Sequence, residues 1–165
     1  WFEIDFPDVI DLRRRLYPER EGCSLIGCSV TDPAWLSDIP RDRPAMIVAE
    51  GLMPYLGPTE PQLLIERLVS CLPAGEIVFD AYSRLGVRLL SFNPSIRATG
   101  ATLRWALDDP TDLIADIPKL ELVEETLAHD LAELERIAPA FGIVLPLWNL
   151  IPYLRRIGRL LRYRF

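Results

Sequence analysis

Ile47-Val48-Ala49-Glu50-Gly51-Leu52-Met53-Pro54-Tyr55-Leu56 is the most informative stretch for the fold, because a short apolar run is followed by one acid, one glycine and a bulky segment that contains proline. A continuous run of Ile, Val and Ala is typical of a strand buried on both faces, as in a parallel sheet. The carboxyl ends of strands form the ligand crevice of open α/β sheets, so Glu50 is a candidate binding residue, and Gly51 lets a ligand approach the backbone. The alternative is a solvated acid at a strand end, since glutamate is rarely buried without a partner.

Outward from this strand, apolar runs alternate with amphipathic segments. We expect a strand from Trp1 to Asp5, a helix to about Tyr17, a strand over 23–30, a helix starting near Thr59 and a strand over 76–82. This alternation predicts a doubly wound α/β sheet. Further along, 120–125 and 159–165 have strand patterns, whereas 131–137 and parts of 143–157 have helical ones. The basic residues of 155–164 are interpreted as a solvated strand face.

The alternation of strand and helix patterns stops between residues 83 and 118, where arginines and turn-forming residues are frequent and no strand pattern is recognisable. A long insertion between sheet strands is usually a lid or a pocket wall. We therefore expect 83–118 to be a substrate-side insertion or lid of a single domain.

Length, charge and composition argue against nucleic-acid-binding and membrane-spanning proteins. The chain has 165 residues, enough for one domain with a real core, and its net charge of −6 argues against a nucleic-acid groove. No charge-free apolar run reaches the length of a membrane span, and no signal peptide is recognisable. The three cysteines favour buried, reduced thiols in a cytoplasmic protein. Because Trp1 already continues a strand pattern, we expect the chain to be the C-terminal portion of something longer.

Several catalytic motifs are absent from the sequence. The only histidine is His129, and no serine nucleophile elbow accompanies it. Neither GxxxxGK[ST] nor GxGxxG occurs, and the acids between 108 and 116 are better explained by turns and helix starts than by metal binding. The sequence therefore predicts no metal site and identifies no catalytic base.

Three features in this order resemble the leucine carboxyl methyltransferase family, which includes bacterial O-methyltransferases associated with polyketide biosynthesis. They are the acid-ended strand Phe2-Glu3-Ile4-Asp5-Phe6-Pro7, the turn Ser29-Val30-Thr31-Asp32-Pro33-Ala34-Trp35, and Ala49-Glu50-Gly51-Leu52 with Tyr55-Leu56. The resemblance continues through 105–110 and 159–165. It implies an α/β class I methyltransferase (Rossmann-like) fold and S-adenosyl-L-methionine as the cofactor.

The resemblance also implies cofactor-binding roles for particular residues. Asp5 would accept hydrogen bonds from the ribose, Ser29 and Val30 would lie beside the adenine, and Glu50 with Gly51 would lie near the methionine portion. Many members have Asp-Leu at the adenine position, so Ser29 departs from the family pattern. The family's first strand, its glycine-rich turn and its N-terminal helices would precede Trp1. That strand would lie between those ending at Asp5 and Glu50, so an upstream part of the same protein would be needed to complete the sheet.

The leading hypothesis is an S-adenosylmethionine-dependent O-methyltransferase, or its C-terminal fragment, that methylates a hydroxyl or carboxyl oxygen of a small molecule. Catalysis would come mainly from positioning the two reactants. Tyr82, Arg104 and Trp105 are candidates for the substrate pocket. One alternative is a nucleotide-dependent oxidoreductase on a similar sheet, and another is a non-catalytic remnant that acts as an interaction module.

Overall fold

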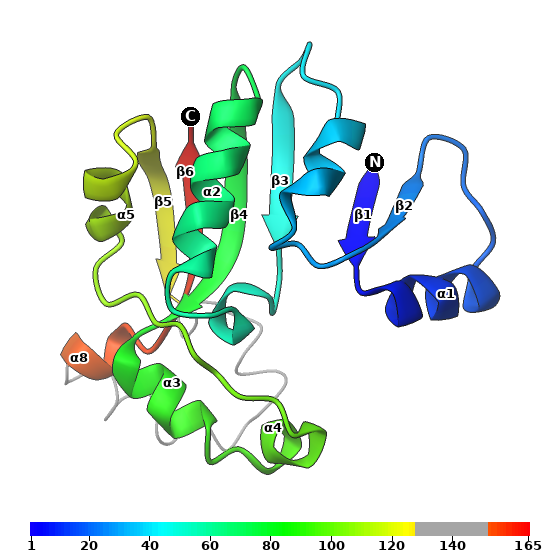
Figure 1. Cartoon of the computed structure of the whole chain (residues 1–165). Helices are drawn as coiled ribbons and strands as arrows, with labels where there is room; N and C mark the ends of the chain where they lie inside the picture. Colours follow the sequence, from blue (N-terminus) through cyan, green and yellow to red (C-terminus); the bar gives the residue numbers. More distant parts are fainter. Residues whose placement is uncertain (128–151) are drawn as a thin grey trace.

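The computed structural model describes residues 1–127 and 152–165 (Figure 1). His129, the predicted helix over 131–137 and most of the predicted helical pieces in 143–157 lie outside the described residues. Of that last region, the structure describes the short helix α8 (Pro152–Arg155).

The chain begins with a small parallel unit. Strands β1 (Phe2–Asp5) and β2 (Ser24–Gly27) pair with each other, and helix α1 (Pro7–Leu16) connects them. Pro7 is tolerated at the start of α1 because the first helical amide has no intrahelical partner. Asp8 in the first turn and the arginines in the last turn have the signs that the helix dipole prefers. Strand β2 is shorter than the predicted 23–30.

A larger mixed sheet follows, with the strand order β3-β4-β6-β5. Strands β3 (Ala45–Ala49) and β4 (Gly75–Tyr82) are parallel, and β6 (Gly158–Arg164) runs antiparallel between β4 and β5 (Glu121–Leu127). The predicted C-terminal strand is therefore an interior strand of the sheet. The 3-10 helices η1 (Pro33–Asp38) and η2 (Met53–Tyr55) flank β3, and α2 (Glu60–Cys71) connects it to β4.

Strand β3 is not buried on both faces, contrary to the prediction from its apolar run. Met46 and Val48 are each 57% exposed, whereas Ala49 is buried. The reason is topological: among the strands of residues 1–127 and 152–165, β3 pairs with β4 alone and forms the edge of its sheet. The facing edge of the other sheet is β1 (Figure 1).

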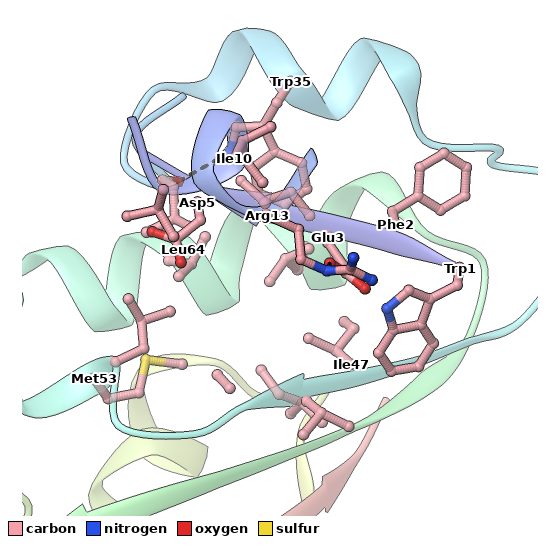
Figure 2. Close-up of a pocket in the computed structure, with 18 residues that line it drawn as sticks. Trp1, Phe2, Glu3, Asp5, Ile10, Arg13, Trp35, Ile47, Met53 and Leu64 are labelled. Carbon is pink, nitrogen blue, oxygen red and sulfur yellow. Dashed lines mark hydrogen bonds and ion pairs between the residues drawn. The ribbon is translucent and has the colours of Figure 1, made fainter. Parts of the chain in front are cut away.

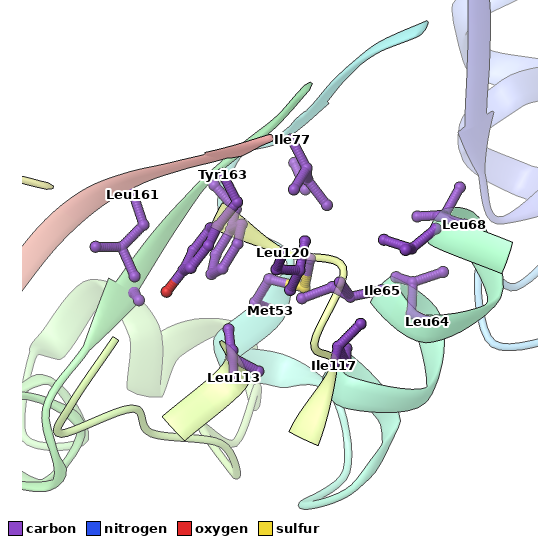
Figure 3. Close-up of a cluster of buried hydrophobic side chains, with 14 of the residues drawn as sticks. Met53, Leu64, Ile65, Leu68, Ile77, Leu113, Ile117, Leu120, Leu161 and Tyr163 are labelled. Atoms are coloured by element: carbon purple, nitrogen blue, oxygen red, sulfur yellow. The ribbon is translucent and has the colours of Figure 1, made fainter. Parts of the chain in front are cut away.

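The core lies on one face of the four-stranded sheet. Helix α2 contributes Leu64, Ile65 and Leu68, which pack with sheet residues such as Ile77 and Tyr163 (Figure 3). The ring of Tyr163 stacks on that of Phe79, with centroids 5.7 Å apart. Burying such aromatic side chains provides much of the hydrophobic stabilisation of a domain.

Residues 83–118 divide into two halves. Helices α3 (Arg84–Leu90) and α4 (Pro94–Thr99) lie beyond the ends of β3 and β4 (Figure 1). The second half, which includes α5 (Thr111–Asp116), buries apolar side chains in or beside the core. They are Leu103, Trp105, Leu107, Leu113 and Ile117. The second half of 83–118 therefore belongs to the core, and the lid stays a prediction that only residues 84–100 could fulfil.

The basic residues of β6 do not all form a solvated face. The Arg159 side chain is fully buried and paired with Glu125 at 3.2 Å, and it donates to the carbonyl oxygens of Leu107 and Asp108. Arg162 and Arg164 lie on the other face and pair with Glu76. Side chains alternate across a strand, so neighbouring arginines of one basic run have opposite environments.

Candidate functional site

A cavity of about 440 Å³ lies where β1, β2 and β3 end. Its volume is within the range of small-molecule and cofactor pockets. All five predicted cofactor-binding residues line it: Asp5, Ser29, Val30, Glu50 and Gly51. Residues up to 46 positions apart in the chain are therefore brought to one place by parallel strands that end at the same edge.

Asp5 is the last residue of β1, and its side chain is exposed towards the cavity. One carboxylate oxygen accepts a hydrogen bond from the amide of Phe6 at 2.7 Å, where the chain turns into α1. A carboxylate has about four lone-pair sites, so it retains acceptor capacity for a ligand hydroxyl.

The turn after β2 is fixed by side-chain hydrogen bonds, two of them local and one from helix α2. The Ser29 and Thr31 hydroxyl oxygens lie 2.8 Å apart, the Trp35 indole donates to the Val30 carbonyl at 3.1 Å, and the Arg67 guanidinium donates to the Thr31 carbonyl at 2.8 Å. Asp32 caps η1 by accepting from the amide of Ala34. The cavity wall at this turn is thus held by η1 and α2.

The third side of the cavity is the Glu50-Gly51 turn. Gly51 has φ +60°, in the left-handed region where a residue without a Cβ is preferred. Its amide donates to the Asp80 carboxylate of β4 at 2.7 Å. Glu50 is exposed, and within residues 1–127 and 152–165 its carboxylate has no ion-pair or hydrogen-bond partner. Its negative charge is therefore free to meet a ligand.

The cavity is acidic. Its lining contains the carboxylates of Asp5 and Glu50, and no lysine or arginine of the described chain is among its lining residues. Cys28 also lines it, and burial together with nearby Asp32 and Asp38 raises the pKa of its thiol. The thiol therefore stays protonated and neutral near pH 7. This acidic lining attracts cationic groups and repels phosphates.

The three predicted substrate-pocket residues have different environments. Tyr82, the last residue of β4, is half-buried, and burial followed by the charge and hydrogen bond of Asp80 raises the pKa of its phenol. Arg104 is exposed, and its amide donates to the Pro54 carbonyl at 2.7 Å. Trp105 is only 7% exposed and packs against Phe79 with centroids 6.3 Å apart. The structure thus places Trp105 in the core and does not bring it to the cavity.

Sequence reasoning did not assign two residues that complete this region. Tyr55 lines the cavity from η2, and Asp80 holds the Gly51 amide from β4. Asp80 lies near the exit of an apolar strand, as Glu50 does, and this shared position was the available signal. The partner of Asp80 is 29 residues away, which no local pattern reveals.

A second cavity, of about 370 Å³, separates β1 from β3. Figure 2 shows Trp1, Phe2 and Glu3 on one side and Ile47 on the other. An ion pair between Arg13 and Glu3, at 3.2 Å, lies at its wall. The remaining lining is mostly apolar, with Ile10, Leu64 and Leu68 among the contributors. We call this cavity the inter-sheet groove.

In the described part of the chain, no three His, Cys, Asp or Glu side chains gather as a metal-binding group. The three cysteines are free, and each is partly exposed instead of buried as predicted. None of the helices within 1–127 and 152–165 is long and apolar enough to cross a membrane.

This architecture is that of the class I S-adenosylmethionine-dependent methyltransferases, which confirms the predicted fold class. A methyltransferase from Mesorhizobium loti superposes with a TM-score of 0.67 at 12% identity, covering 99% of this chain and 79% of that one. A DUF574 family protein from Streptomyces avermitilis superposes with a TM-score of 0.65 at 16% identity, covering 99% of this chain and 64% of that one.

Sequence comparison gives closer relatives. The chain is 42% identical to the tetracenomycin polyketide synthesis O-methyltransferase TcmP of Streptomyces glaucescens over all of its length and 61% of that protein. It is 34% identical to the S-adenosyl-L-methionine-dependent methyltransferase dpfgK of Gibberella zeae, of which it covers 60%. The predicted resemblance to S-adenosylmethionine-dependent O-methyltransferases is thereby confirmed. No family model matches the chain. The chain spans about three fifths of the length of these relatives.

Proposed function

We propose that this chain forms the cofactor-binding part of an S-adenosylmethionine-dependent O-methyltransferase that acts on a hydroxyl or carboxyl oxygen of a small molecule. The observation that carries the proposal is the acidic cavity of about 440 Å³ into which Asp5, Ser29 and Glu50 converge at the ends of three strands. The similarity of the whole of this chain to parts of an O-methyltransferase and of an S-adenosyl-L-methionine-dependent methyltransferase supports it.

The cavity chemistry fits this cofactor. Asp5 offers acceptor sites suited to ribose hydroxyls, and the unpaired Glu50 carboxylate suits an ammonium group. The left-handed turn at Gly51 leaves space, because a Cβ placed there would meet nothing within 4 Å. When bound, the cofactor supplies an electrophilic methyl group on a sulfonium cation. The part of the protein is to hold the two reactants in line and exclude water.

The alternative of a nucleotide-dependent oxidoreductase fits the cavity less well. A nicotinamide dinucleotide carries a pyrophosphate, which needs backbone amides or basic groups. Here the lining that the structure describes carries two carboxylates and no cation. Electrostatic repulsion therefore disfavours that ligand at this cavity.

The inter-sheet groove supports a further part of the proposal: an upstream segment of the same protein fills it as a parallel strand. Strands β1 and β3 run in the same direction on its two sides (Figure 1), and each pairs with only one neighbour in the part of the chain that the structure describes. Open edges offer unpaired amides and carbonyls to an added strand. The exposed Met46 and Val48 of β3 and the apolar groove lining would then be covered. The cytoplasm is the proposed location, in keeping with three free thiols.

Calorimetric titration with S-adenosylmethionine tests both parts. The product of the complete natural reading frame is expected to bind it, and Glu50→Gln and Asp5→Asn are each expected to weaken binding at least tenfold, since hydrogen bonds to charged groups contribute about 1.5–3 kcal/mol. Asp42→Asn, exposed and paired only with its neighbour Arg43, is the matched control. Tighter binding to NAD(P) would contradict the proposed activity.

The same titration on residues 1–165 alone tests whether cofactor binding needs the upstream segment. We expect weak or no binding without the upstream segment. We also expect the amides of Ile4 and Val48, which point away from β2 and β4, to exchange rapidly in the isolated chain and slowly in the longer one, because only the longer chain would pair both edges. Equal exchange in the two chains would contradict the strand docking.

A further inference from the structure

The cofactor cavity is built from two parts of the chain. One part contributes the residues proposed for ribose and adenine, and we call it the adenosine half: Asp5, Ser29 and Val30. The other part contributes the residues proposed for the methionine portion, and we call it the methionine half: Glu50 and Gly51. The adenosine half follows strands of the two-stranded sheet and the methionine half follows β3 of the four-stranded sheet, so the cavity spans two sheets (Figure 1).

Within residues 1–127, a single hydrogen bond joins the part that carries the adenosine half to the part that carries the methionine half. Nη1 of Arg67 in α2 donates to the carbonyl oxygen of Thr31 at 2.8 Å, across 36 positions of sequence. The other hydrogen bonds and ion pairs of residues 1–127 stay inside 1–44 or inside 45–127. The only directed contact between the two parts in this range is therefore the one that Arg67 makes.

Apolar packing also holds the two parts together, but it does not orient them. Trp35 and Leu36 of η1 share one core cluster with Leu64 and Leu68 of α2. Hydrophobic attraction is non-directional, whereas a hydrogen bond requires a defined distance and angle. The bond from Arg67 thus selects one placement of the turn after β2 among those that the apolar contact allows.

We propose that Arg67 is a positioning residue that sets the spacing between the adenosine half and the methionine half of the cofactor cavity. This proposal rests on the methyltransferase function proposed above. Thr31 passes the position of α2 on to Ser29, because the two hydroxyl oxygens lie 2.8 Å apart and the Thr31 amide donates to Ser29 Oγ at 3.3 Å. S-adenosylmethionine would engage both halves at once, and a bridging ligand gains from its second contact only where the spacing matches.

The helix that carries Arg67 is a firm base for this contact. Ile65 has no exposed surface and Leu68 is 5% exposed, so α2 is anchored in the core of the four-stranded sheet. The upstream strand proposed above would pair with β1 and β3, which leaves β2 as the outer strand of its sheet. The turn after β2 therefore still depends on Arg67 in the complete protein.

Two substitutions separate the hydrogen bond from the packing of the side chain. Arg67→Ala removes the donor to Thr31 and keeps a strong helix former in α2, whereas Arg67→Lys keeps a cationic donor. In the protein encoded by the complete natural reading frame, Arg67→Ala is expected to weaken S-adenosylmethionine binding about tenfold, as the loss of a hydrogen bond from a charged donor predicts. Arg67→Lys is expected to keep most of the binding.

Arg41→Ala is the matched control. The Arg41 side chain also donates to a backbone carbonyl, that of Leu36 at 3.5 Å, but both residues lie within 1–44. Its loss removes an arginine-to-carbonyl bond that does not join the two halves. S-adenosylmethionine binding is therefore expected to stay at the wild-type level in this variant.

Adenosine is the probe that distinguishes spacing from local support of the adenine side. It would engage the adenosine half alone, so its dissociation constant in Arg67→Ala, measured by ligand-observed NMR, is expected to change by less than about twofold. Equal losses for adenosine and S-adenosylmethionine would overturn the spacing role. Unchanged S-adenosylmethionine binding in Arg67→Ala, or the same loss in Arg67→Lys, would also overturn it. A wild-type protein that binds S-adenosylmethionine but not adenosine would contradict the division into halves.

Failure of the proposed function has a different signature. A wild-type protein that binds neither S-adenosylmethionine nor adenosine would refute the methyltransferase assignment. The bond from Arg67 is still measured, because NMR of its guanidinium group needs no cofactor. Bonding to Thr31 is expected to slow the rotation and solvent exchange of the Nη protons, whose signal is assigned by its absence in Arg67→Lys. A freely rotating guanidinium in the wild type would refute the link independently.

Discussion

Replacing Arg159 with methionine is expected to destabilise the fold by about 3 kcal/mol, because it removes one partner of a buried ion pair. The Arg159 side chain has no exposed surface and donates to Glu125 and to the carbonyls of Leu107 and Asp108. These carbonyls belong to the second half of the insertion 83–118. Without Arg159 they lose a buried donor, and each orphaned acceptor adds to the cost.

The magnitude follows from the environment of each partner. Breaking a buried pair by removing one partner costs about 3–5 kcal/mol. Glu125 is 21% exposed and lies 3.9 Å from Arg156, so it is not left without a cation and the lower end applies. The Nε atom of Arg159 is already buried without a hydrogen-bond partner, and methionine removes that penalty. A loss of about 3 kcal/mol corresponds to a fall in Tm of about 6–12 °C for a domain of this size.

Urea unfolding followed by circular dichroism, with a thermal scan, measures this loss on the wild type and Arg159→Met. Arg162→Met is the matched control, since Arg162 is on the same strand and also pairs with glutamates, but its side chain is 39% exposed. Solvent screening makes its contribution small, so a much smaller loss is expected. If the two variants lose equal stability, burial does not determine the contribution of these arginines and the reasoning is refuted.

Two further predictions concern the same core. Gly75→Ala is expected to cost about 1–3 kcal/mol, because a Cβ at this position would collide with the Ala45 carbonyl and lie 2.8 Å from the Phe165 ring; unchanged urea stability would contradict this contact. Burial raises the pKa of the Tyr163 phenol, so above about pH 10 the unfolded chain loses its proton first and stability falls as the pH rises. Tyr163→Phe is expected to flatten this alkaline slope and to cost about 1 kcal/mol at neutral pH, since the hydroxyl donates to the Pro110 carbonyl at 2.8 Å. Urea titrations at several pH values check this, and an unchanged alkaline slope in the variant would refute it.

The elements that carry the candidate site were predictable because their signals are local. A strand followed by an acid appears as an apolar run and one charged residue, and this pattern located Asp5 and Glu50. Parallel strands of an α/β sheet end at a common edge, so convergence of these residues followed from the fold class. The turn at Ser29 was recognisable from Asp32 and Pro33, and the structure confirms the cap that Asp32 provides.

Other features depended on neighbours that no local pattern contains. The apolar run of β3 indicated burial on both faces, yet Met46 and Val48 are exposed because no strand pairs with the outer edge of β3 in the described chain. Trp105 looked like a pocket residue within an irregular segment, but the segment packs back on Phe79. Arg159 belonged to a basic run, and only the position of β6 between β4 and β5 placed it inside.

Local sequence was enough to predict the strands that carry the candidate site, the acids at their ends and the kind of ligand that such acids suit. These properties depend on hydrophobic periodicity and side-chain chemistry, which are present in short stretches of chain. The tertiary structure alone decided that Asp80 holds Gly51, that Tyr55 lines the cavity and that Arg159 is buried. Each of these is a contact through space between segments that are distant in sequence, and the packing of the sheet determines which of them meet.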